Sequence, residues 1–375
     1  MPSRSGGTWR SVRKMTNQRS GYGASPSLVE LASGVDALYL SGNGFLSDDR
    51  LALLEGHRTE AEAADDAVEL HVQGEQLWLQ PFGFGKYRYR LVHQAGLVGV
   101  TTSKSLPALR VQPRAEFLHA VGPASAFAFF GALGEAIAGC PVSWTVSRLD
   151  LFCDVQGWTL DGDSRHRFVC RAKRRDLHEE GDAFTGFEFG RRNTKTVCAR
   201  IYDKSHQVNA KGLDWWYDIW GPAYDRSRPV LRIEIELGRQ GLTEYGVDTP
   251  ADALAQAATL WASTTSKWLR YCAPTADETP SRWPSAPEWE HIQHAKLRGD
   301  AAGIDRIRAN RRKGEIRRLL PALVGYLSRI AALSGAEDLP SALGATRYLV
   351  AVDERRRGVA FEDRIALHAA EEQRR

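Results

Sequence analysis

Paired cysteine motifs are absent from this sequence of 375 residues. The five cysteines are an odd number and form no C-x-x-C pair, so the composition does not indicate a disulfide framework. We therefore expect reduced thiols in a cytoplasmic protein. No apolar run reaches the roughly 18 residues that a membrane-spanning helix needs, and we predict no membrane partner.

A large net charge is also absent. The formal charge is +4 and the isoelectric point is near 8.8, so the chain as a whole is not a polycation. An anionic partner would have to be bound by local clusters of basic residues. Most of the basic residues are arginines, which suit bidentate contacts to phosphate.

The first 27 residues are basic and rich in serine and glycine, and no apolar segment of the secretory type follows them. We expect a disordered arm here. Contact with nucleic acid and simple solvation are both open for this arm. No repeat of fixed period occurs in the chain.

Alternation of apolar and polar residues predicts a series of short strands in the first part of the chain, separated by turns that contain glycine. They are "VDALYLS", "VELHV", "QLWLQ", "KYRYRL", "VGVTT" and "ALRVQ". One side of "KYRYRL" is basic, either as a solvated face or as a face that carries a nucleic-acid backbone. An apolar helix is predicted at 124–138, with Gly139 as its C-cap.

Further strands are predicted at 144–155, 184–190, 197–203 and 230–237, followed by a helix at about 250–270 with Thr249 as its N-cap. The fold class that we predict is α+β, with an antiparallel-sheet core and packing helices. A proline-rich stretch then predicts a linker, and an arginine-rich helical region for DNA binding or assembly follows it. The predicted units are the arm 1–27, a domain 28–272 with halves 28–140 and 141–272, the linker 273–288 and the region 289–375.

Three of the predicted strands place charged residues on one face and apolar residues on the other. They are "RLDLFCD", "ARIYDK" and "LRIEIEL". The residues that share these polar faces are Arg148, Asp150 and Asp154; Arg200, Tyr202 and Lys204; and Arg232, Glu234 and Glu236. If the strands are neighbours in one sheet, carboxylates, cations and one phenol converge on a single surface.

Such a surface suits phosphoryl transfer. Clustered carboxylates bind Mg²⁺ or Mn²⁺ through hard oxygen ligands, and the metal polarises a phosphodiester. A phenol has a pKa of about 10 and becomes a usable nucleophile beside cations and a metal-bound phosphate. Each strand alone also fits an ordinary sheet face with solvated charges. The occurrence of all three together favours chemistry.

The ordered set "RLDLFCD" (148–154), "FEFGRRNTKTVCARIYDKSHQ" (187–207) and "RPVLRIEIELGR" (228–239) resembles the replication-initiation-factor family of rolling-circle plasmid initiators. The same family includes some phage initiators and relaxases of mobile elements. The resemblance covers about residues 100–265 and is strongest over 145–240. It implies an antiparallel-sheet nuclease core that nicks DNA.

The resemblance implies a role for each matching residue. Tyr202 is the nicking nucleophile, and Arg200 and Lys204 hold the scissile phosphate. The implied metal ligands are Asp150, Asp154, Glu234 and Glu236. The upstream segment "LRVQP" departs from the family because Gln112 stands where a glutamate is usual. No His-hydrophobic-His triplet occurs, which favours Mg²⁺ or Mn²⁺ over Zn²⁺.

Two basic clusters are candidates for DNA contacts, "RHRFVCRAKRRD" (165–176) and "DRIRANRRKGEIRR" (305–318). We expect the first to border the active site, because it lies between the Asp150 and Tyr202 strands. The second is either a recognition helix or a solvated helix face. The residues that we expect to contact DNA are Arg148, Lys173, Arg174, Arg175, Arg191, Arg192, Lys195, Arg232, Arg311, Arg312 and Lys313.

Trp215, Trp216 and Trp220 form a dense aromatic segment between the tyrosine strand and the Glu234 strand. They either fill a small core or stack the bases of an extruded single strand.

The function that the resemblance implies is site-specific nicking through a 5′-phosphotyrosine, which starts rolling-circle replication of a plasmid or a related element. The expected partners are origin DNA, both double-stranded and as an extruded single strand, with a host helicase and a DNA polymerase. A homodimer is a further expectation. A relaxase for conjugative mobilisation has the same chemistry and is the first alternative. A DNA-binding replication regulator without catalysis is the second.

Overall fold

The structure is a computed structural model that describes residues 28–181, 183–297 and 323–374. The predicted arm, 1–27, and the basic residues Arg311, Arg312 and Lys313 therefore lie outside the described residues.

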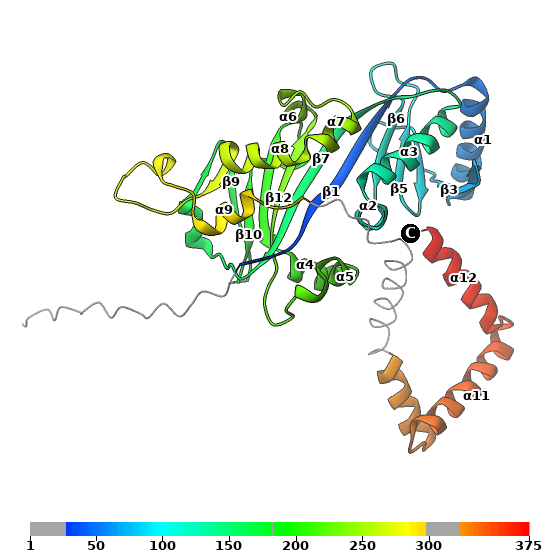
Figure 1. The fold of residues 1–375 in the computed structure, drawn as a ribbon. Helices are drawn as coiled ribbons and strands as arrows, with labels where there is room; N and C mark the ends of the chain where they lie inside the picture. Colours follow the sequence, from blue (N-terminus) through cyan, green and yellow to red (C-terminus); the bar gives the residue numbers. More distant parts are fainter. Residues whose placement is uncertain (1–27, 182, 298–322, 375) are drawn as a thin grey trace, which may run out of the picture.

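One antiparallel sheet of 11 strands runs through the body of the protein (Figure 1). Its long central strands β1 and β7 pair along almost their whole length. From edge to edge the strands are β2 (Val68–Val72), β3 (Glu75–Leu79), β4 (Tyr89–His93), β5 (Gly96–Val100), β6 (Leu109–Pro113), β1 (Val29–Asn43), β7 (Ser143–Gln156), β12 (Leu231–Gly238), β11 (Val197–Asp203), β10 (Ala183–Phe189) and β9 (Arg175–Glu180). A separate pair joins β8 (Phe168–Cys170) to β13 (Leu269–Tyr271).

The apolar face of the sheet carries most of the helices, and their buried side chains form one core with those of the strands. These helices are α1 (Asp48–Ala64), α3 (Pro123–Ala138), α6 (Arg239–Glu244), α7 (Pro250–Ala255), α8 (Ala257–Ser263) and α9 (Pro287–Gln293). The shorter α2 (Ala115–Val121) packs beside β1. The predicted α+β class, with an antiparallel sheet and packing helices, is confirmed.

The opposite face carries α4 (Lys204–Lys211) and α5 (Trp216–Trp220), which Figure 1 shows on the other side of the sheet from α6, α7 and α8. They form a second, smaller cluster around Phe152, Val208 and Val230. The tryptophan segment fills this cluster, since Trp215, Trp216 and Trp220 are all buried. The first of the two interpretations of that segment, a small core, describes what the structure shows.

Local signals in the sequence place several element ends correctly. α3 ends at Gly139, which has a φ of 73° in the left-handed region that glycine tolerates. Thr249 caps α7, because its hydroxyl accepts a hydrogen bond from the backbone N–H of Asp252. The helix predicted at 250–270 is shorter, because the chain passes from α7 to α8 and then into a π-turn at Thr264–Trp268.

The packed domain extends beyond the boundary that the sequence analysis sets. Residues 273–288 are predicted as a linker, but Ala286 is fully buried in the main core. The first helix after the predicted boundary also belongs to this core, since Trp289 and Ile292 of α9 are 0% exposed. The Trp289 indole donates to the carbonyl oxygen of Thr265 at 2.8 Å. The domain therefore continues to about Leu297.

The last described residues form helices at Leu323–Ser334, α11 (Leu339–Arg357) and α12 (Phe361–Arg374). Figure 1 shows α11 and α12 away from the sheet and its covering helices. The expected helical character of this region is thus confirmed for residues 323–374. Within the described part of the chain, no single helix is both long and apolar enough to cross a membrane.

Replacing Trp289 by alanine tests the extended boundary. Because the indole is fully buried and hydrogen-bonded, Trp289→Ala should lower the free energy of unfolding by about 3–5 kcal/mol. The exposed His291 on the same helix provides the control, and His291→Ala should change stability by less than about 0.5 kcal/mol. Urea denaturation of both variants measures the difference. Equal, small effects would mean that α9 is a detachable linker element.

Candidate active site

The polar residues that the sequence analysis places on one face do meet there. β7, β12 and β11 are neighbours in that order, so the three strands form one continuous surface. Cross-strand partners are Asp154 with Arg232, Asp150 with Glu236, Glu234 with Arg200, and Arg232 with Tyr202. The expected convergence of carboxylates, cations and a phenol on one sheet face is therefore confirmed.

Tyr202 lies at the centre of this surface. Its phenol donates a hydrogen bond to Oε2 of Glu234 at 3.0 Å. The guanidinium of Arg200 lies 5.1 Å from the centroid of the tyrosine ring and forms an ion pair with the same glutamate. Gly186 of β10 faces Tyr202, and an added Cβ there would come within 2.9 Å of the tyrosine Cβ. The glycine thus leaves room for the tyrosine side chain.

The protonated form of Tyr202 is strongly favoured in this setting. Burial raises the pKa of the phenol well above its usual value, and the negative charge of Glu234 raises it further. Arg232 and Arg200 oppose this shift without overcoming it. The flanking cations therefore do not generate a phenolate by themselves. A nucleophilic Tyr202 needs a base at the moment of attack, and Glu234 is in hydrogen-bond contact with its proton.

Lys204 stands at the end of the tyrosine strand, where β11 gives way to α4. Its side chain is 4% exposed, and its ammonium donates to Oε1 of Gln207 at 2.7 Å. The ammonium lies 4.6 Å from the ring of Trp216 and 6.0 Å from that of Tyr202. Burial lowers the pKa of Lys204 to about 8, and the nearby Arg232 adds to this effect.

Asp150 and Glu236 lie side by side on β7 and β12 and share one arginine. Arg148 donates from Nε to Oδ1 of Asp150 at 2.7 Å, and its Nη2 lies 3.0 Å from Oε2 of Glu236. The loop between β10 and β11 closes over this pair. The backbone N–H of Asn193 donates to Oε1 of Glu236 at 2.6 Å, and the Asn193 side chain accepts from Arg148 at 2.6 Å.

Three of the four predicted metal ligands fit a divalent cation by charge. Asp150, Glu234 and Glu236 are buried together, and burial and the charges of the two glutamates outweigh Arg148 and raise the pKa of Asp150 to about 7. Oε2 of Glu236 is buried and accepts no hydrogen bond, although it forms an ion pair with Arg148. Hard carboxylate oxygens with excess negative charge are what Mg²⁺ and Mn²⁺ bind. Among the described residues, however, no three carboxylate, histidine or cysteine side chains are already arranged around a common metal position.

Asp154, the fourth predicted ligand, is placed differently. Arg232 binds both oxygens of its carboxylate, at 2.6 and 2.8 Å, and the Trp220 indole donates to Oδ2 at 2.8 Å. The second partner of Arg232 is Asp36 of β1, at 2.9 Å. The guanidinium also lies between two rings, 4.2 Å from Phe152 and 4.1 Å from Trp216. The charge of Asp154 is thus balanced by a fully buried guanidinium, without the excess negative charge of the other three carboxylates, and we interpret it as a structural ion pair.

The structure separates the expected DNA contacts into two groups. Arg232 is 0% exposed, so its guanidinium cannot reach DNA in this conformation, and Arg148 is occupied by Asp150, Glu236 and Asn193. The exposed residues of the predicted set, which remain candidates, are Lys173, Arg174, Arg175, Arg191, Arg192 and Lys195. Arg192 reaches Oε2 of Glu236 at 4.0 Å, which places it at the rim of the carboxylate cluster.

The first basic cluster reaches the site only at its end. Asp176 of β9 pairs with Glu188 of β10, and Glu188 pairs with Arg200 of β11. Arg174 forms an ion pair with Asp176 at 2.6 Å. The pKa of Arg174 is raised mainly by Asp176 and to a smaller extent by the nearby Glu188. The earlier residues of the cluster lie in the β8 segment, away from Tyr202.

Sequence reasoning did not single out Asp36, Glu188 or Asn193 as site residues. Asp36 lies within the apolar stretch "VDALYL", and that isolated carboxylate was a usable signal. Burial opposes its ionisation, but Arg232 and His119 hold the pKa of Asp36 well below its usual value. Asn193 belongs to a loop, where periodicity carries no information.

Gln112 lies on β6 beside a cavity that Tyr39 also lines, separated from the carboxylates by β1.

Asp203, the residue after Tyr202, has a structural role. Its carboxylate accepts a hydrogen bond from the backbone N–H of His206 at 2.9 Å and thereby caps α4.

Comparison with known proteins gives structural neighbours but no match by sequence. No family model matches the chain, and no curated protein matches it. Among solved structures, the chain is similar to a rolling circle replication initiator protein from Geobacillus stearothermophilus, with 14% sequence identity and a TM-score of 0.45. The match covers 73% of this chain and 100% of that chain.

The lowered pKa of Lys204 predicts a pH-dependent stability difference. Folding costs free energy while buried Lys204 is charged, below its folded pKa of about 8. Between that pH and the unfolded value of about 10.4, the folded chain binds fewer protons than the unfolded chain, so stability from this group rises with pH. Relative to Lys204→Met, the wild type should gain about 2 kcal/mol between pH 7 and pH 9.5.

Urea denaturation of both proteins at the two pH values measures this gain. A difference between the two proteins that stays constant from pH 7 to pH 9.5 would mean that the ammonium remains charged in the folded chain.

Proposed function

We propose that this protein nicks DNA at a specific site and starts rolling-circle replication, with Tyr202 as the nucleophile. The observation that carries the proposal is the 3.0 Å hydrogen bond from the Tyr202 phenol to Glu234, on the sheet face that also holds Arg200, Asp150 and Glu236. A phenol in contact with a base, beside cations and carboxylates, has the parts of a phosphotyrosine-forming site. The order of the motifs along the chain supports the same proposal.

The proposed step is a transesterification. The phenol oxygen of Tyr202 attacks the scissile phosphorus, and its proton passes to Glu234. The bond from phosphorus to the 3′ oxygen of the preceding nucleotide breaks, and the leaving oxygen takes a proton from water, which gives a free 3′ hydroxyl and a 5′-phosphotyrosine. Arg200, whose side chain is 18% exposed, lies beside the phenol and can bind the negatively charged phosphate oxygens. No energy-rich cofactor is needed, because one phosphodiester replaces another.

Divalent metal belongs to the same proposal. Asp150, Glu234 and Glu236 would hold Mg²⁺ or Mn²⁺, which would polarise the phosphodiester and offset charge in the transition state. Arg148 then keeps the carboxylate pair of Asp150 and Glu236 together, and Asn193 fixes the position of Glu236. Asp154 and Arg232 stabilise the α5 end of the same surface as a buried ion pair.

The products define the partners that we propose. A free 3′ hydroxyl is a primer for a host DNA polymerase, and displacement of the nicked strand requires a host helicase. Origin DNA is the substrate, both as a duplex and as an extruded single strand. Nicking at an origin of transfer by a relaxase uses the same step at Tyr202.

Replacing Tyr202 by phenylalanine tests the proposal directly. With Mg²⁺ or Mn²⁺ and supercoiled plasmid that carries its origin, the full-length protein should produce nicked circles with a covalent 5′ adduct. Tyr202→Phe should abolish nicking, because the attacking oxygen is lost, and should retain DNA binding. Agarose gels and filter binding read the two outcomes.

Tyr217→Phe and Tyr224→Phe are matched controls. Both side chains pack against the smaller cluster around α5, and neither phenol should form the covalent bond to DNA. Wild-type protein that binds its origin yet never nicks it would identify a DNA-binding regulator and reject the enzyme. Nicking that survives Tyr202→Phe and disappears in either control would mean that another phenol attacks.

Removal of the base is a separate test. Glu234→Gln keeps the shape of the side chain and removes its basicity, so the rate of nicking should fall by about 10²–10⁴-fold. Glu188→Gln is the matched control, since Glu188 faces Arg200 on the neighbouring strand without contacting the Tyr202 phenol in the structure. Its effect should stay below about tenfold. Equal losses in the two variants would assign Glu234 a general electrostatic role.

A further inference from the structure

A basic groove lies next to the carboxylate cluster, at the end of the β10–β11 hairpin. It has a volume of about 890 Å³. We call it the basic groove and define it by the cations Arg171, Lys173, Arg174, Arg191 and Lys267 and the aromatic residues Tyr245 and Trp268. Its walls come from three separate parts of the chain: the segment after β8, the hairpin loop, and the region from α6 to the π-turn.

The charge of the basic groove is strongly positive and mostly uncompensated. Five cations line it against one carboxylate, Glu244. Among the described residues, only Arg174 of the five forms an ion pair, with Asp176. Lys173, Arg191 and Lys267 are exposed. Cations that remain without carboxylate partners in a concave site attract phosphate groups.

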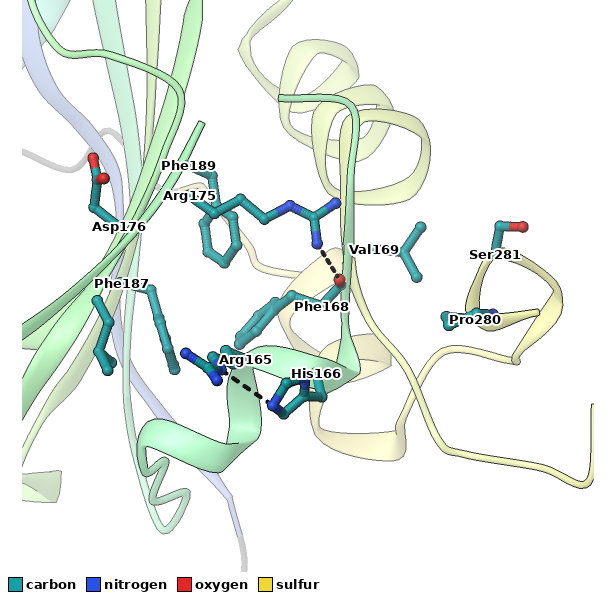
Figure 2. Close-up of a pocket in the computed structure, with 11 residues that line it drawn as sticks. Arg165, His166, Phe168, Val169, Arg175, Asp176, Phe187, Phe189, Pro280 and Ser281 are labelled. Atoms are coloured by element: carbon teal, nitrogen blue, oxygen red, sulfur yellow. Dashed lines mark hydrogen bonds between the residues drawn. The ribbon is translucent and has the colours of Figure 1, made fainter. Parts of the chain in front are cut away.

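A neighbouring cavity serves as a contrast. Figure 2 shows this cavity, of about 490 Å³, lined by the rings of Phe168, Phe187 and Phe189. Its basic groups already have partners in the chain. Arg175 donates to the carbonyl oxygens of Phe168 and Cys170, at 3.3 and 3.0 Å, and Arg165 donates to His166 at 3.1 Å. These two guanidiniums are thus held by neutral groups of the chain, whereas the side chains of Lys173, Arg191 and Lys267 make no such hydrogen bond within the described part of the chain.

The hairpin loop links the basic groove to the candidate active site. Gly190, Arg191 and Thr196 line the groove, while Arg192 and Asn193 of the same loop reach Glu236. The backbone N–H of Gly190 donates to the carbonyl oxygen of Arg174 at 3.0 Å, which ties the loop to the groove wall. A ligand in the basic groove would therefore lie beside the carboxylate cluster.

We propose that the basic groove binds the single-stranded DNA that flanks the nicked phosphate. Its volume admits a few nucleotides of single strand, whereas a duplex would touch only its rim. The half-buried rings of Tyr245 and Trp268 offer surfaces on which unpaired bases stack, and the cations bind the phosphates between them. The proposal rests on the proposed function for the identity of the strand, and on the groove alone for single-strand binding.

The test uses the full-length Tyr202→Phe protein, so that binding is measured without cleavage. Fluorescence anisotropy with a labelled thymidine decamer reports single-strand affinity, and a duplex of matched length reports double-strand affinity. In the variant Lys173→Gln/Lys267→Gln, the single-strand affinity should fall about tenfold. The slope of log K against log salt should shrink by about 1.4, since each phosphate contact on a single strand contributes about 0.7.

Lys104→Gln/Lys211→Gln is the matched control, because it removes the same charge from two exposed lysines outside the groove. It should leave single-strand affinity within about twofold of the parent protein. Trp268→Leu should also weaken single-strand binding about tenfold, through loss of stacking. Circular dichroism confirms that each variant is folded. Duplex affinity should change by less than about twofold in the groove variant.

Equal losses for duplex and single strand, an unchanged salt slope, or equal effects of the two double variants would each overturn the proposal. The proposed function fails separately. Nicking of origin plasmid by the wild-type protein is read on gels, so intact single-strand binding without any nicking would reject the enzyme and leave the basic groove in place. Nicking by the wild-type protein, together with unchanged single-strand affinity in the groove variant, would reject the basic groove and leave the enzyme in place.

Discussion

Arginine pairing of buried carboxylates is the constraint on which the rest of this site depends. β7 and β12 place Asp150, Asp154, Glu234 and Glu236 on one sheet face with almost no exposure to water. Buried charges without partners are strongly destabilising, so each of these carboxylates requires a cation. The cations are Arg148, Arg200 and Arg232, which come from β7, β11 and β12. The strand register that aligns these pairs also brings the Tyr202 phenol to Glu234.

The pairs divide the face into two regions with different properties. At the α5 end, Arg232 is enclosed by Asp36, Asp154, Phe152 and Trp216, and all its charge is satisfied internally. Nearer the hairpin loop, three carboxylates face two partly exposed arginines, and negative charge is in excess. Burial and this excess together raise the pKa of Asp150, and the excess makes this region the one that can accept a cation. Tyr202 lies at the border between the two regions.

The sequence was sufficient for the strands and their faces. Alternation in "RLDLFCD", "ARIYDK" and "LRIEIEL" identifies which side chains point away from the core, and the register confirms it for residues of all three strands. The sequence did not predict which carboxylate pairs with which arginine, because these ion pairs depend on contacts across the sheet. Asp36 meets Arg232 over a separation of 196 residues, and no local pattern encodes that contact. Arg232 therefore looked like a DNA contact in sequence and is a buried structural cation.

The prediction that the domain ends at residue 272 was wrong for a related reason. Proline-rich composition predicts a linker, but the prolines around 280–287 only shape a turn before α9 inserts Trp289 into the core. Alternation also assigns Lys204 to the Tyr202 face, and its ammonium does lie 6.0 Å from the Tyr202 ring, although Asp203 ends the strand by capping α4.

The central claim is that Tyr202, activated by Glu234, forms a covalent bond to DNA. The most direct measurement is mass spectrometry of peptides from the full-length protein after reaction with its origin DNA and nuclease digestion. The account predicts a nucleotide adduct on the peptide that contains Tyr202. An adduct on Tyr217 or Tyr224, or no adduct on protein that has nicked its DNA, would contradict it.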